Sequence, residues 1–212
     1  VKRFTEAAAN NDVNNLEATS ETIIELLNAL ATGATANGSI FAKSPLVSQF
    51  VCSSLQQLMA AAFNGNSVAL ETGLAIVSEL LSKVKLDKYD NSQEAPTLIA
   101  TIVSVISSYF SPCIQQLTKE PDEVIELTFG RLSPPLGISR IALISFLTCF
   151  VKLNARQAFD AILKTSLVQL SINLFFRYPW NTILHQYVLE MLHVILTSSH
   201  RGLKQNILVD CS

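Results

Sequence analysis

The residue types best suited to bind a metal ion or to transfer a proton lie near the end of the 212-residue chain, where all three histidines occur. His185 and His193 are eight positions apart, so on one helix they would be separated by about 12 Å, too far for a shared metal ion. Glu190 and His193 have the i, i+3 spacing of di-iron bundles, but such a site needs that pair twice, with two further glutamates. The sequence holds one copy, and we therefore predict no metal site.

Other motifs that carry chemistry are missing from the sequence. It contains no G-x-G-x-x-G, G-x-x-x-x-G-K-[ST], H-E-x-x-H or G-x-S-x-G, the signatures of dinucleotide, phosphate, zinc and serine-nucleophile sites. The four cysteines are widely spaced, which indicates small apolar thiols in a reducing compartment: Cys52, Cys113, Cys149 and Cys211. We predict a protein without enzymatic activity or cofactor, located in the cytoplasm, with the nucleus as a second location.

The composition excludes several classes of protein. Apolar residues make up 49 % of the chain and charged residues 15 %, which is too apolar for a disordered segment. The net charge of −2 gives no general attraction to nucleic acid. Residues 1–130 hold 14 acids and 7 bases, whereas residues 131–212 hold 3 acids and 8 bases. This asymmetry fits either a polarised protein partner or a chance distribution over solvated surfaces.

We expect neither a signal peptide nor a membrane span. Lys2 and Arg3 are not followed by an apolar run. The apolar block Leu98–Phe110 would reach about 20 Å as a helix, short of a hydrocarbon core of about 30 Å, so we predict a buried helix there. Because the chain starts at Val1, we interpret residues 1–212 as a single-domain fragment of a larger protein.

Hydrophobic periodicity predicts a chain built from nine or ten helices with almost no strands. The predicted helices cover 16–30, 45–62, 67–81, 97–110, a segment from 121 to about 132, 138–153, 156–163, 167–176 and 182–197. We predict that Ser67 caps the helix at 67–81. The polar segment near 83–95 is predicted to be a mobile loop, and Ser111-Pro112 is predicted to break a helix. After Thr197 we expect a fraying end.

The spacing of these helices predicts their architecture. Successive starts recur every 17 to 29 residues, so a helix pair takes about 40–50, the period of HEAT and armadillo repeats. We therefore predict an all-α fold, an α-solenoid of stacked helix pairs. A compact irregular helical domain is the alternative.

The most unusual local sequence is LFFRYPWNTILH at 174–185, which holds four aromatic residues at a break between two helices. Arg, Tyr and Trp are enriched at protein interfaces because each combines a large area with a polar group. The alternative is a structural joint in which the aromatic residues fill the corner and Asn181 caps the next helix. Both interpretations remain open, and they are compatible.

Two motifs in this half of the chain resemble the SAPS-domain family, the regulatory subunits of protein phosphatase 6. They are Pro134-Pro135-Leu136-Gly137 with Arg140, and the segment 174–185. The helix at 18–26 is similar to a less specific family element. Pro179 and Thr182 depart from the family pattern, and Pro179 removes one backbone N–H donor.

The resemblance implies a non-catalytic scaffold that binds the phosphatase catalytic subunit and, in some complexes, an ankyrin-repeat subunit. We predict that the contact surface contains Arg140, Arg177, Tyr178, Trp180, Asn181 and His185, with Arg177 and Asn181 as the exposed polar contacts. Two alternatives are a helical-repeat adaptor for another partner, in trafficking or transport, and an all-helical enzyme.

Overall fold

The computed structural model describes residues 1–10, 12, 14–15, 18, 45–83, 97–119, 125–127, 130–132 and 135–210. Within these residues the regular elements are helices, apart from one short hairpin. The elements in chain order are α1 (Lys2–Ala9), α4 (Pro45–Asn64), α5 (Ser67–Lys83), α6 (Thr97–Ser107), α7 (Phe110–Thr118), β1 (Ile125–Leu127), β2 (Gly130–Leu132), α8 (Ile138–Lys152), α9 (Arg156–Leu163), α10 (Leu167–Arg177), α11 (Thr182–Thr197) and α12 (Arg201–Asp210).

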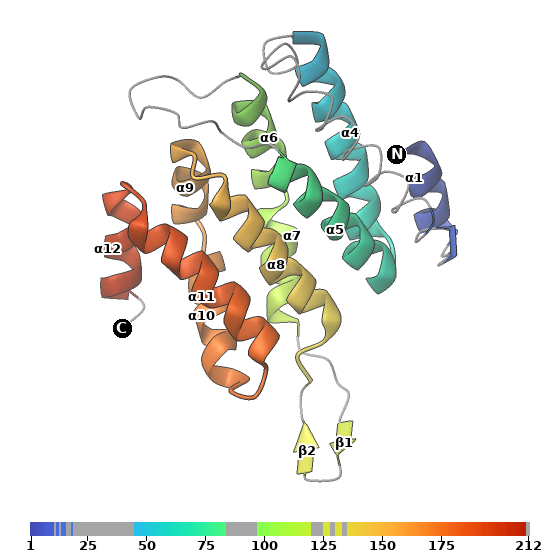
Figure 1. The fold of residues 1–212 in the computed structure, drawn as a ribbon. Helices are drawn as coiled ribbons and strands as arrows, with labels where there is room; N and C mark the ends of the chain where they lie inside the picture. The colour runs from blue at the N-terminus through green and yellow to red at the C-terminus, as the bar shows by residue number, and fades with distance from the viewer. Residues whose placement is uncertain are drawn as a thin grey trace.

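The helices pack in layers. In one layer α8 lies between α5 and α11, and Figure 1 shows these three helices side by side. In the other layer α4 packs on α6, α6 on α9 and α9 on α12, while α7 packs on α10. This layered helix packing is plausible for the predicted solenoid, and the repeat itself stays a prediction.

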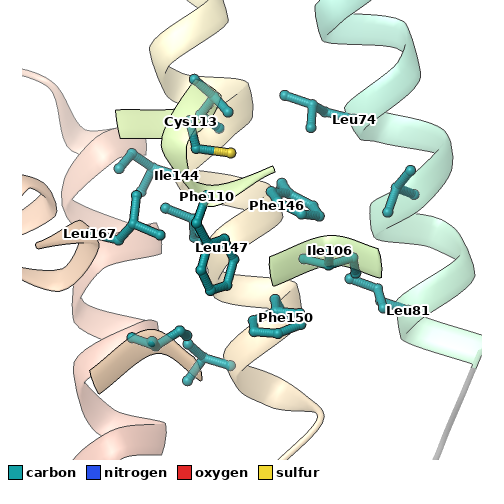
Figure 2. Close-up of a cluster of buried hydrophobic side chains, with 14 of the residues drawn as sticks. Leu74, Leu81, Ile106, Phe110, Cys113, Ile144, Phe146, Leu147, Phe150 and Leu167 are labelled. Atoms are coloured by element: carbon teal, nitrogen blue, oxygen red, sulfur yellow. The ribbon is translucent and has the colours of Figure 1, made fainter. Parts of the chain in front are cut away.

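The apolar core lies between the two layers and is centred on α8. Figure 2 shows Phe146 and Phe150 of α8 among Ile106 of α6 and Leu74 of α5. Phe146 and Phe150 are fully buried, and Phe150 meets Phe110 of α7 edge-to-face at 5.6 Å between ring centroids. A helix with neighbours on several sides must be apolar around much of its circumference, which explains the broad apolar face of α8.

Six predicted helices are confirmed within two residues at each end: α4, α5, α8, α9, α10 and α11. The predicted helix at 16–30 and the predicted loop near 83–95 lie outside the described residues, apart from Ala18 and Lys83. Among the described residues, no single helix is long and apolar enough to cross a membrane; α9 and α10 pass that test only as a pair bent by 72°.

The predicted break at Ser111-Pro112 is wrong. The chain turns at Ser108 and Tyr109 instead, and Pro112 is the third residue of α7. The first N–H groups of a helix have no intrahelical acceptor, so a proline in the first turn removes no hydrogen bond of the helix.

The predicted helix from 121 to about 132 is also wrong, because residues 125–132 contain an antiparallel hairpin. Glu126 lies opposite Arg131 in its register. Ile125-Glu126-Leu127 alternates apolar and polar residues with a period of two, which is a strand pattern, whereas the acids before it had suggested a helix start.

Three further details differ from the sequence analysis. The N-terminal residues form α1, and the expected fraying end forms α12. Asn66, not Ser67, caps α5, because its side-chain Oδ1 accepts the backbone N–H of Ala69 at 2.8 Å. Asn is among the strongest N-cap residues, so the neighbouring serine is not needed in that role.

Candidate functional site

The candidate site is the corner between α10 and α11. The backbone N–H of Tyr178 donates to the Leu174 carbonyl at 3.0 Å, and Pro179 then ends the helical pattern. The N–H of Asn181 donates to the Tyr178 carbonyl at 3.1 Å. Asn181 Oδ1 accepts the N–H of Leu184 at 2.9 Å and so caps α11, which confirms the cap predicted for the structural joint.

A buried arginine fixes this corner to the start of α8. Arg140 is 4 % exposed, and its Nη1 donates to the Tyr178 hydroxyl at 3.4 Å. Its Nη2 donates to the backbone carbonyl of Lys119, just after α7. A buried guanidinium needs such acceptors, because an unpaired buried charge is strongly unfavourable. The two sequence motifs are therefore joined in space by the contact between Arg140 and Tyr178.

His185 fixes the corner from the α11 side. Its Nε2 lies 3.0 Å from the backbone carbonyl of Phe175, so that nitrogen carries a proton and donates. Its ring also stacks on the Phe175 ring at 4.1 Å between centroids. The first turn of α11 is thus held against the last turns of α10, and the corner has little freedom to open.

Four exposed side chains surround this rigid corner, and we call them the corner patch: Phe176, Arg177, Trp180 and Ile183. Trp180 is 94 % exposed, Phe176 is 74 % exposed and Ile183 is 54 % exposed. The guanidinium carbon of Arg177 lies 5.9 Å from the centroid of the Tyr178 ring, a cation–π distance. The patch therefore presents three large apolar side chains beside one cation.

The predicted site residues divide into two groups. Arg140 and Tyr178 are buried, and Asn181 and His185 are partly buried in contacts that shape the corner. Arg177 and Trp180 are exposed and can meet a partner directly.

Sequence reasoning missed Phe176 and Ile183. The adjacent pair Phe175-Phe176 was the available signal, since a helix buried on one side cannot bury both. In α10 the buried positions are Leu167, Val168, Ser171, Ile172 and Leu174, which leaves Phe176 on the outside.

Outside this corner, few of the described side chains are suited to metal binding or catalysis. They contain no group of three or more His, Cys, Asp or Glu residues that could hold a metal ion. Burial raises the pKa of the Cys113 thiol to about 12, so this sulfur is not a thiolate nucleophile at neutral pH. A cavity of about 410 Å³ lies between α6–α7 and α9–α10, and Lys164 is the ionisable residue among those that line it.

Comparisons with known proteins gave partial similarities. No family model and no solved structure matches the chain. It is 29 % identical over 89 residues to serine/threonine-protein phosphatase 6 regulatory subunit 3-A of Xenopus laevis, an alignment covering 41 % of this chain and 10 % of the relative. Regulatory subunit 3 of Gallus gallus is 23 % identical over 111 residues, covering 52 % and 13 %. Regulatory subunit 1 of Homo sapiens is 32 % identical over 78 residues, covering 36 % and 9 %.

The chain is similar, in part, to regulatory subunits of protein phosphatase 6. The aligned segments span about a tenth of the length of these relatives. The relatives are named as regulatory and not as catalytic subunits, which agrees with the predicted absence of enzymatic activity.

Proposed function

We propose that this chain is a non-catalytic regulatory subunit that binds a serine/threonine phosphatase catalytic subunit of the protein phosphatase 6 type and directs its activity. The partial similarity to regulatory subunits supports the class of function. The observation that carries the choice of surface is Trp180, 94 % exposed at a corner held by buried side chains.

The geometry of the corner patch suits a docking anchor. Large apolar side chains on a surface are most useful where a partner removes them from water. Binding also costs less conformational entropy when the anchor is already fixed in place. Here Arg140 holds the Tyr178 side chain on one side of Trp180 and Asn181 caps α11 on the other, so the indole is presented from a rigid support. Arg177 adds a cation for an acidic group at the rim of the partner surface.

The wider assignment follows from the same proposal. We propose an α-solenoid of the HEAT or armadillo type, in which stacked helices provide an extended docking surface. An ankyrin-repeat subunit is the proposed second partner, and we propose no contact with nucleic acid. The described cysteines Cys52, Cys113 and Cys149 are free thiols, which supports the proposed cytoplasmic or nuclear location.

Co-purification tests the proposal directly. The full chain, carrying an affinity tag, is expected to retain the catalytic subunit from a cell extract, identified by mass spectrometry. Replacing Arg177 and Trp180 together by alanine is expected to abolish retention while the circular dichroism spectrum stays helical. Leu196→Ala is the matched control, because Leu196 is an apolar α11 residue, 45 % exposed, outside the corner patch. It should bind like the unmodified chain.

Each other result has a defined meaning. Retention by the double variant would remove the corner patch from the proposed interface. Loss of helical signal in that variant would show that the exposed pair supports the fold. Recovery of a different partner, with no phosphatase catalytic subunit, would favour the adaptor function instead.

A further inference from the structure

His200 occupies the N-cap position of α12 and contacts two different helices. Its Nδ1 accepts the backbone N–H of Leu203 at 3.1 Å, which is the capping contact of the third helical residue. Its Nε2 lies 2.8 Å from Oδ1 of Asp160 on α9. The ring also packs beside Phe159 of α9, at 5.7 Å between centroids. One imidazole therefore joins α12 to α9.

These two contacts determine the protonation state of the ring. An amide N–H can only donate, so Nδ1 must be unprotonated where it meets Leu203. A carboxylate can only accept, so Nε2 must carry a proton where it meets Asp160. The arrangement is satisfied by the neutral imidazole in its Nε2–H form. A second proton would sit on Nδ1, facing another donor, and would remove the cap.

Charged side chains on both α9 and α12 lie near the ring. Asp160 favours a protonated ring, but its side chain is 50 % exposed and its other oxygen lies 3.9 Å from Nε of Arg156. On α12 itself, Arg201 and Lys204 place two further cations in the first turn. A positive charge at a helix N-terminus is also unfavourable, because the helix dipole is positive there.

We propose that His200 is an acid-sensitive latch that holds α12 on α9 while its ring is neutral and releases the first turn of α12 when the ring is protonated. Histidine is the side chain that ordinarily changes charge between about pH 5 and 8. Leu203, which this turn carries, is 1 % exposed and belongs to the apolar core. Release would therefore loosen the packing of α12 against its neighbours, and this proposal does not depend on the proposed function.

Amide hydrogen exchange and imidazole ¹⁵N NMR on the full chain test the latch. At pH 7.5 the ring should show the Nε2–H tautomer. Between pH 7.5 and 5.5, the protection of the Leu203 amide, corrected for the intrinsic pH dependence of exchange, should fall roughly five- to tenfold, the effect of losing a cap and adding an unfavourable charge. His200→Asn retains a cap acceptor that does not titrate, so its protection should not change over this range.

A second variant and three outcomes complete the test. His200→Ala has no acceptor and should show the low protection at both pH values. The proposal is overturned if Leu203 is equally or better protected at pH 5.5, if the ring stays neutral down to pH 5.5, or if the Nδ1–H tautomer is present at pH 7.5. Increased protection at low pH would mean that the ion pair with Asp160 outweighs the lost cap.

Discussion

The hydrogen bond between Arg140 and Tyr178 can be tested by a double-mutant cycle. Tyr178→Phe removes the hydroxyl and leaves the buried ring in place. The bond is charge-assisted but long, at 3.4 Å, so we expect the free energy of unfolding to fall by about 0.5–1.5 kcal/mol. For a chain of this size, 1 kcal/mol corresponds to a shift in melting temperature of about 2–4 °C.

Arg140→Met removes both guanidinium contacts while filling much of the same volume. It removes a donor from the Lys119 carbonyl and from the Tyr178 hydroxyl inside a buried corner, so we expect a loss of about 2–4 kcal/mol. In the double variant the hydroxyl is already gone. Its loss of stability should therefore be about 1 kcal/mol smaller than the sum of the losses in the two single variants.

Urea unfolding followed by circular dichroism measures the stability in all four proteins of the cycle. Trp180 is the single tryptophan, so its fluorescence anisotropy reports the mobility of the corner separately from global unfolding. We expect lower anisotropy in both single variants under native conditions. Additive losses in the cycle, together with unchanged anisotropy, would refute the contact and the rigid support that we infer for Trp180.

Three further predictions concern the cap, a thiol and the core. Asn181→Ala should lower the free energy of unfolding by about 1 kcal/mol in thermal denaturation, and Asn181→Asp should restore most of it, since aspartate also caps. Burial raises the pKa of the Cys113 thiol to about 12, so this cysteine should resist maleimide at pH 7.5 in the folded chain and react after denaturation. Peptide mass spectrometry measures the reaction. Reaction without denaturant would contradict the burial of this thiol. Phe146→Ala should cost about 3–5 kcal/mol in urea unfolding, and a loss below 1 kcal/mol would place Phe146 outside a packed core.

Local sequence signals predicted the parts of the fold that depend on local interactions. The bounds of α9 and α11 agree with the predicted ranges, because each helix starts after a recognisable break and carries its own apolar periodicity. The cap at Asn181 was equally accessible, since it depends on residues three positions apart. The sequence does not predict the hairpin, because the acidic segment near a proline indicates a helix start and so conflicts with the alternation that follows it.

The candidate site shows why the remaining features could not be predicted. Arg140 and Tyr178 are 38 positions apart. No local sequence signal indicates that an arginine near the start of α8 is buried against a tyrosine of a distant corner. The orientation of Phe176 likewise depends on which face of α10 packs on α7. Both features follow from tertiary packing. Hydrophobic periodicity indicates only which face of a helix is apolar and which is polar.

The two interpretations of the segment at 174–185, a structural joint and a proposed docking surface, concern two sides of one corner. The buried side, with Tyr178 and His185, removes the conformational freedom that would otherwise be lost on binding. The exposed side, with Trp180 and Phe176, offers the area that a partner can remove from water. A flexible tryptophan would lose more entropy on docking, and a rigid corner without exposed aromatic side chains would bury little apolar area. Weakening the buried side should therefore reduce affinity for the proposed partner even though none of its residues need touch that partner.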